Sequence, residues 1–152
     1  MTRVFESLDA LKAVTGEVIG TSDWLTVTQE RIDTFADATG DHQWIHVDPE
    51  RAAKGPFGGT IAHGYLTLSL LPTLAAEIYT VENLAFGMNY GADKVRFPAP
   101  VPVDSRLRAT ATLTSTKEIA IGTQLAFTYV IEREGADKPV CIAEVLYVYA
   151  GA

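Results

Sequence analysis

The chain has 152 residues, of which 47% are hydrophobic and 20% charged, a composition typical of a single folded domain. We therefore expect one domain over residues 1–152. A net charge of −7 with scattered basic residues argues against nucleic acid as a partner, because phosphate binding needs clustered lysines and arginines.

Two further classes of protein are disfavoured. The single cysteine, Cys141, lies in an apolar run, so we interpret it as a small buried hydrophobic residue and expect no disulfide within the chain. No apolar signal region begins the chain. The longest apolar stretch, about residues 65–76, is interrupted by polar residues and is too short to cross a membrane. We expect a cytoplasmic protein with no membrane partner.

The first forty residues are predicted to form short elements with clear caps. Ser7 is a suitable N-cap for a helix that reaches about Val14, and residues 23–27 alternate as a strand does. Thr28 caps a second helix. Gly40 is well placed to end this helix in a left-handed conformation.

The middle of the chain combines a loop with the most apolar helix. Residues 41–47 show no periodicity and are predicted to form an ordered, non-helical loop, whereas residues 48–50 carry strong helix-start signals. A long helix is expected from about residue 64 to Tyr79, and its extensive apolar surface requires burial. Pro72 removes one backbone hydrogen bond within it, which predicts a kink or a break.

The second half of the chain is predicted to be nearly all strand. Residues 84–97 are typical of a strand pair interrupted by glycines, and a proline-marked connector follows. Alternating polarity then predicts strands at 106–114 and 124–132, and a turn at 135–139 precedes a last strand at 140–149. One buried helix followed by about five antiparallel strands predicts an α+β fold, a curved sheet wrapped around the helix.

An acid and a histidine stand five residues apart after the second helix. Asp41 and His46, held close on a rigid loop, can share one water, which the carboxylate deprotonates while the imidazole orients it or donates. The spacing alone is also compatible with an aspartate that caps a turn and a histidine bonded within its loop.

The same segment resembles the signature of the MaoC-like dehydratases, also called R-specific enoyl-CoA hydratases. The signature runs from an aromatic residue through Gly-Asp, Asn-Pro, an aliphatic residue and His to a small residue. The matching positions are Phe35, Gly40-Asp41, Ile45-His46 and Ala52. Gln43-Trp44 replaces Asn-Pro, a variant similar to the nodulation protein N-like branch.

Two later segments strengthen the resemblance. Residues 59–67 are similar to the family's approach to its central helix, and residues 95–101 to its strand and proline-marked turn. The three motifs together cover most of residues 24–149. The resemblance implies the hot-dog fold and a homodimer with sheets joined edge to edge. No metal-ligand spacing and no nucleotide-binding loop is visible, so no metal and no cofactor are expected.

The resemblance also implies a reaction. Water adds reversibly to a trans-2-enoyl thioester of CoA or acyl carrier protein and gives an R-3-hydroxyacyl thioester. Asp41 and His46 would activate the water, and the backbone N–H of Gly64 would stabilise negative charge on the thioester oxygen. The missing Cβ of Gly64 lets a substrate approach the backbone.

Six further residues are candidates for substrate binding. Those near the motif are pocket-wall candidates, and the two basic residues are candidates for the phosphates of the carrier arm. They are Gln43, Trp44, His63 and Tyr65, and Lys94 and Arg96. Each also has a structural interpretation as a packing residue, a backbone-bonded histidine or a solvated charge.

Two other functions remain open on the same fold. A thioesterase usually needs an acid on or near the central helix, and Glu77 lies late on that helix, beyond the proline. A non-catalytic acyl-thioester binding subunit would have no need of the Asp41–His46 pair.

Overall fold

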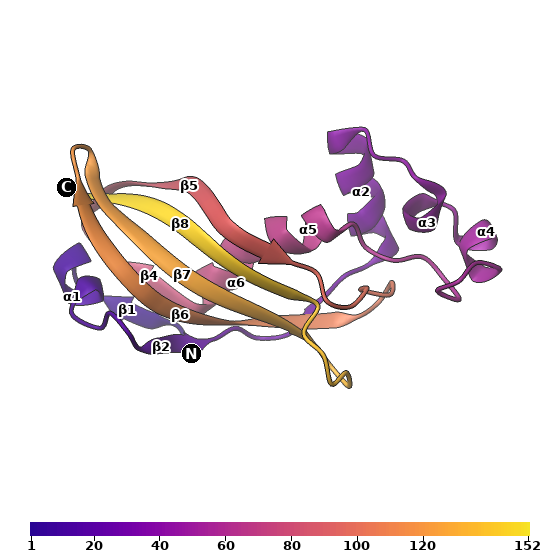
Figure 1. Cartoon of the computed structure of the whole chain (residues 1–152), viewed down its shortest axis with the longest axis horizontal. Coiled ribbons are helices and arrows are strands. Elements are labelled where there is room, and N and C mark those ends of the chain that lie inside the picture. Colours follow the sequence, from indigo (N-terminus) through magenta and orange to yellow (C-terminus); the bar gives the residue numbers. More distant parts are fainter.

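The computed structural model describes all residues, 1–152, and its body is a strongly curved antiparallel sheet (Figure 1). Its strands follow the order β2-β6-β7-β8-β5, and β3 also pairs with β6. Their bounds are β2 (Val18–Thr21), β3 (Leu25–Thr26), β5 (Leu84–Arg96), β6 (Arg106–Ile119), β7 (Gly122–Arg133) and β8 (Cys141–Gly151). A separate parallel pair joins β1 (Arg3–Phe5) to β4 (Tyr79–Val81).

The central helix lies against the concave side of the sheet as two pieces, α5 (Gly64–Ser69) and α6 (Leu71–Ile78) (Figure 1). The predicted break is confirmed, because the helix is interrupted at Leu70 and Pro72 stands in the first turn of α6. A proline is tolerated there because its missing N–H would have no helical partner. The apolar face that the sequence indicated is buried in the core: Leu66, Leu70, Leu74 and Ile78.

Three short helices project beyond one end of the sheet, next to the start of α5 (Figure 1). They are α2 (Gln29–Thr39), α3 (Trp44–Val47) and α4 (Pro49–Ala53), and we call residues 29–53 the overhang. At the other end of the sheet, α1 (Leu8–Lys12) has the expected cap, since Ser7 Oγ accepts a hydrogen bond from the Ala10 N–H. Thr28 caps α2 and Gly40 ends it with φ +82°, as predicted.

Three local predictions were wrong. The loop predicted at 41–47 contains α3, and the strand predicted at 23–27 is only the two residues of β3. The strand pair predicted at 84–97 is one continuous strand, β5. Gly87 marks a close approach and not a turn, since a Cβ there would lie 2.9 Å from the ring of Tyr149, and Gly91 lies at an irregularity in the pairing of β5 with β8.

No helix of the structure is long and apolar enough to span a membrane. Cys141 is fully buried, and burial raises the pKa of its thiol to about 11, which agrees with its interpretation as a small hydrophobic residue.

Candidate active site

Asp41 and His46 come from the two ends of a turn in the overhang. Gly40 ends α2 in the left-handed conformation, and Asp41 follows directly, with its Oδ1 accepting a hydrogen bond from the Gln43 N–H at 3.3 Å. His46 lies in α3 and is buried, whereas Asp41 is exposed. The turn therefore brings a solvent-facing carboxylate to a sheltered imidazole.

The structure adds a third side chain, His63, to this pair. One potential ligand atom from each of Asp41, His46 and His63 lies within 4.8 Å of the other two. Two groups that share one water, each at about 2.8 Å, lie roughly 4.5–5 Å apart. The spacing of these polar atoms therefore suits a single shared water.

Hydrogen bonds fix the tautomer of His46. Its Nδ1 lies 2.7 Å from the carbonyl oxygen of Ile61, which can only accept, so Nδ1 carries the proton and Nε2 has a free lone pair. Burial lowers the pKa of His46, which the bond to Ile61 only partly opposes. His46 is therefore neutral at pH 7 and can accept a proton. Gln29 holds its backbone by donating from Nε2 to the His46 carbonyl at 2.8 Å.

The same three side chains do not form a good metal centre. The rings of His46 and His63 are stacked, with centroids 3.9 Å apart and planes inclined by 24°. Imidazole binds a metal in the plane of its ring, and the planes of these two rings are nearly parallel and offset by the stacking distance, which disfavours one ion lying in both planes. The cluster is suited to holding water and protons.

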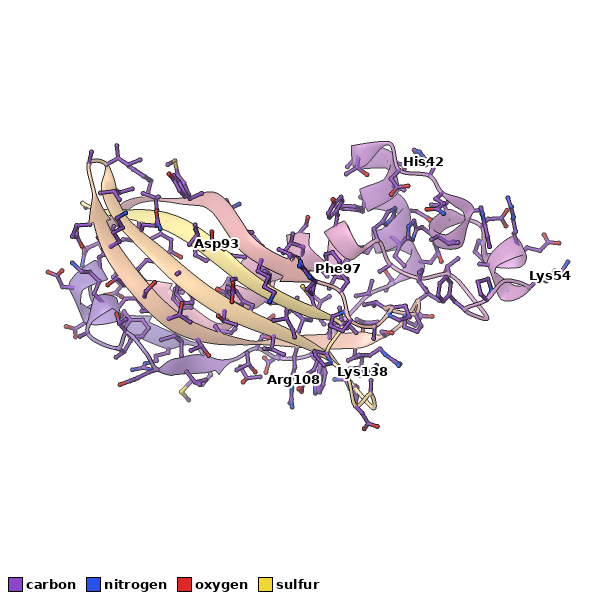
Figure 2. All side chains as sticks on the ribbon, viewed as in Figure 1. His42, Lys54, Asp93, Phe97, Arg108 and Lys138 are labelled. Carbon is purple, nitrogen blue, oxygen red and sulfur yellow. The ribbon has the colours of Figure 1, made fainter.

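The N-terminus of α5 lies beside this cluster. His63 is its N-cap, and the His63 carbonyl accepts hydrogen bonds from the N–H groups of Leu66 and Thr67 at 3.1 and 3.2 Å. The N–H of Gly64 has no backbone partner and is free to donate. A Cβ on Gly64 would lie 3.0 Å from the ring of Phe97, so any larger residue here would require that ring to shift. Figure 2 shows Phe97 where β5 ends, beside α5.

The remaining predicted residues lie at various distances from this centre. Gln43 contributes its backbone N–H to Asp41. Trp44 packs within the overhang, where the Arg51 guanidinium lies 4.3 Å from its ring. Tyr65 is exposed at the start of α5. Lys94 and Arg96 are both exposed on β5, with no ion pair.

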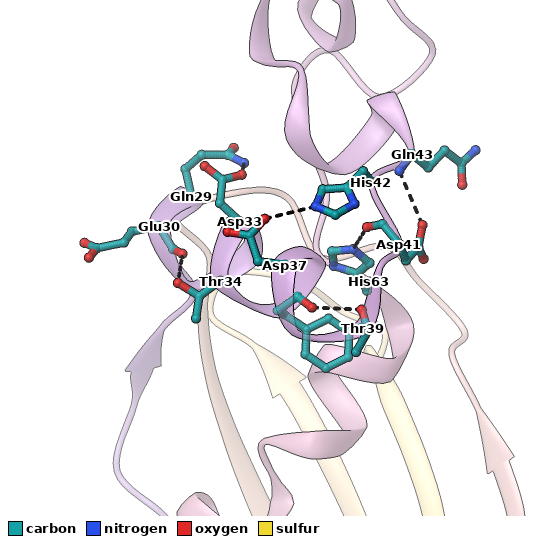
Figure 3. A network of polar contacts seen from close by, with 11 residues as sticks. Gln29, Glu30, Asp33, Thr34, Asp37, Thr39, Asp41, His42, Gln43 and His63 are labelled. Carbon is teal, nitrogen blue, oxygen red and sulfur yellow. Dashed lines mark hydrogen bonds and ion pairs between the residues drawn. The ribbon is translucent and has the colours of Figure 1, made fainter.

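Sequence reasoning did not find the contacts that hold the pair. The Ile61 carbonyl fixes His46, and the ring of Phe35 lies 4.9 Å from that of His63. These contacts join segments far apart in the chain, and a backbone carbonyl carries no signal in the sequence. His42, by contrast, bonds Asp37 at 3.0 Å, and both side chains are exposed (Figure 3).

A curved sheet around a broken helix, with an aspartate and a neutral histidine at the start of that helix, defines a hot-dog domain of the hydratase type. The MaoC like domain family matches residues 10–134, and the chain belongs to that family. The resemblance inferred from three short motifs is thereby confirmed, as is the hot-dog fold.

Relatives cover nearly the whole chain. It is 57% identical over 148 residues to 3-hydroxyacyl-thioester dehydratase Z of Mycobacterium tuberculosis (strain ATCC 25618 / H37Rv), covering 97% of this chain and 98% of the relative. It is 47% identical over 132 residues to nodulation protein N of Rhizobium leguminosarum bv. viciae, covering 84% and 81%. The solved structure of the R-hydratase PhaJ1 from Pseudomonas aeruginosa matches with a TM-score of 0.72 and 20% identity, covering 90% and 83%.

Proposed function

We propose that the protein is an R-specific enoyl-thioester hydratase that also catalyses the reverse dehydration of 3-hydroxyacyl thioesters. The observation that carries the proposal is the neutral His46, with its proton fixed on Nδ1, beside the Asp41 carboxylate. The 57% identity to a relative named as a 3-hydroxyacyl-thioester dehydratase supports the same reaction. The substrate is a thioester of CoA or of acyl carrier protein.

The proposed mechanism needs one water and no cofactor. Asp41 and His46 hold the water and take one of its protons while its oxygen bonds to C3 of the enoyl group. The C2–C3 π electrons move toward the thioester carbonyl, and the proton that the pair took from the water is delivered to C2 on the same face, which returns Asp41 and His46 to their starting protonation states. The Gly64 N–H donates to the carbonyl oxygen, on which negative charge develops in the transition state. Dehydration follows these steps in reverse.

The decisive experiment follows the loss of enoyl absorbance with trans-2-crotonyl-CoA and longer trans-2-enoyl-CoA thioesters, with chiral analysis of the product. The proposal predicts turnover to the R-3-hydroxyacyl thioester. If the folded protein is inactive on every chain length and on carrier-protein thioesters, the result would favour a non-catalytic acyl-thioester binding subunit. Release of free CoA would indicate a thioesterase. The structure disfavours that alternative, because Glu77 Oε2 accepts a hydrogen bond from the Asp23 N–H and is held by the N-terminal segment.

The pH dependence should report His46. Because burial lowers its pKa below the ordinary value of 6.5, we expect kcat/KM to fall on acidification with a midpoint below that value. The exposed His42 provides a control, since its hydrogen bond with Asp37 raises its pKa. If the acidic limb has a midpoint at or above 6.5 and disappears in His42→Asn, the titrating group is His42, and the assignment to His46 is wrong.

A groove suited to an acyl chain runs between the central helix and strands β5 and β8. Two adjoining hollows, of about 260 and 340 Å³, share Pro72, Asn89 and Tyr147 as walls. The groove begins at Leu68, one turn beyond Gly64, and ends at Tyr79, whose hydroxyl lies 2.7 Å from that of Tyr149. We propose that the acyl chain lies here, with its thioester at Gly64.

Narrowing this groove should change selectivity for chain length. Ala76 lines it and is exposed, so Ala76→Phe fills space without entering the core. We expect kcat/KM for trans-2-dodecenoyl-CoA to fall at least about tenfold, with crotonyl-CoA little affected. Thr73→Phe is the matched control, because Thr73 is exposed on the same helix and does not line the groove. Equal losses on both substrates would contradict the assignment.

The open edge of β5 supports a homodimer joined edge to edge. This strand has a neighbour on one side only, and it exposes Phe86, Met88 and Tyr90. We expect a mass of about twice 16.4 kDa by light scattering, and a shift toward monomer in Met88→Lys. Val18→Lys is the control, since Val18 is equally exposed on the opposite edge strand, β2. A monomeric wild type would exclude the dimer.

A further inference from the structure

His63 connects the two halves of the site, and Figure 3 shows its hydrogen bond to Asp41. It is only 3% exposed, and its Nε2 lies 2.9 Å from the backbone carbonyl oxygen of Asp41. Because that carbonyl can only accept, Nε2 carries the proton of the neutral ring. The same ring stacks on His46 with centroids 3.9 Å apart. One side chain thus contacts both members of the water-activating pair.

The backbone of His63 contacts the other half of the site. Its carbonyl accepts the first hydrogen bonds of α5, and the next residue is Gly64, which supplies the free N–H. The water-activating pair belongs to the overhang and the N–H donor to the central helix. His63 is therefore placed to set the distance between them.

Asp41 depends on this contact for its position. Its carboxylate is exposed and has one hydrogen bond, the 3.3 Å contact with the Gln43 N–H, and it follows a left-handed glycine. The His63 bond is the hydrogen bond that joins this turn to the start of the central helix. Without it, only the local turn would hold the carboxylate near His46, through the Asp41–Gln43 bond and the bond from the His46 N–H to the Gln43 carbonyl at 3.0 Å.

We propose that His63 is a positioning residue for the hydratase reaction, one that fixes the Asp41 turn and the His46 ring relative to the N–H of Gly64. The inference rests on the proposed function and replaces the expectation that His63 binds substrate. Two properties support it beyond the contacts. The His63 Nδ1 is buried and makes no hydrogen bond within the protein, so the bond from Nε2 to the Asp41 carbonyl is the one hydrogen bond of this ring. The His63 imidazole also contributes to lowering the pKa of His46.

Two substitutions separate the hydrogen bond from the stacked ring. His63→Phe keeps an aromatic ring against His46 and removes the donor to Asp41. His63→Gln keeps an N–H near the position of Nε2 and removes the ring. The same two substitutions at the exposed His42 serve as controls, because the His42 side chain bonds Asp37 and makes no hydrogen bond to either member of the pair.

We expect His63→Phe to lower kcat about 10- to 100-fold with little change in KM, because a displacement of about 1 Å at the reacting groups is costly. We expect His63→Gln to retain most of kcat. The acidic limb of its kcat/KM profile should move toward higher pH. His63 lowers the pKa of His46 and Asp41 raises it, so removing the His63 ring leaves the effect of Asp41 unopposed by that neighbour. A KM effect alone would overturn the positioning role.

An NMR titration of the His46 ring, without substrate, separates this proposal from the proposed function. Suppose that the wild type is inactive, that the His46 pKa rises in His63→Gln, and that the Asp41 and Gln43 amide signals shift in His63→Phe. The positioning role of His63 is then supported, and the proposed hydratase reaction is wrong. If both variants leave these signals and kcat unchanged, the positioning role is wrong whatever the reaction. If His63→Phe does not fold, the acidic midpoint of the kcat/KM profile of His63→Gln decides whether the positioning role holds.

Discussion

Asp41→Asn should lower kcat for crotonyl-CoA hydration by about 10²- to 10⁴-fold, and His46→Gln by a similar factor, the range typical of a lost acid–base group. Asparagine retains the size of the carboxylate and the acceptor for the Gln43 N–H but cannot take a proton. Glutamine at 46 places its amide near the position of Nε2 and has no basic nitrogen, and it does not reproduce the Nδ1 donor to the Ile61 carbonyl. Asp41→Asn therefore removes chemistry and preserves shape, whereas His46→Gln removes the basic nitrogen together with one hydrogen bond.

The overhang contains a matched control for this experiment. Asp37 and His42 are also five residues apart and are hydrogen-bonded at 3.0 Å, yet both are exposed. Asp37→Asn and His42→Gln make the same chemical changes a few residues away and should leave kcat within about twofold. If they lowered activity as much as the Asp41 and His46 variants, or if those variants lost less than fivefold, the assignment of the pair would be wrong.

Some of this site could be predicted from local residue types. A glycine after a capped helix predicted the turn that presents Asp41, and Pro72 predicted the break in the central helix. Both features depend on backbone conformations that one residue type imposes. The family motif then assigned Asp41 and His46 to the same reaction before any geometry was known.

The short helix α3 could not be predicted in the same way. Trp44-Ile45-His46-Val47 contains two β-branched residues, and Gln43 makes no side-chain cap, so local propensity favours a loop. Long-range contacts stabilise the helix, with Gln29 donating to the His46 carbonyl and His46 donating to Ile61. The protonation state of His46 arises from the same contacts and was equally absent from the sequence pattern.

The interpretation of Gly87 failed for a related reason. A glycine inside an alternating pattern is compatible with a turn, a bulge or a close approach, and the sequence does not name the group that approaches. Here the ring of Tyr149, more than sixty residues later in the chain, occupies the space that a Cβ would need. The contact between His63 and the Asp41 carbonyl is hidden in the same way, since one partner is backbone.

Gly64→Ala should lower kcat by up to about 10²-fold, the cost typical of one lost oxyanion contact, because alanine keeps the backbone N–H but hinders the approach of the thioester oxygen to it. A Cβ at this position would lie 3.0 Å from the Phe97 ring, so the ring or the start of α5 must move. In the proposed reaction the substrate carbonyl must come close to the N–H of residue 64, and an added methyl group on the same residue would hinder that approach. KM should change less than kcat, because the charge that this N–H stabilises develops in the transition state.

Packing and catalysis at Gly64 can be separated by relieving the clash. Phe97 is 39% exposed, so Phe97→Ala opens space at little cost to the core. In the double variant Gly64→Ala/Phe97→Ala the methyl group has room, yet it still obstructs the path to the N–H. We expect the double variant to regain the melting temperature of Phe97→Ala but not its kcat. Full recovery of kcat would mean that Gly64 serves packing alone, and the oxyanion donor would then have to be sought elsewhere.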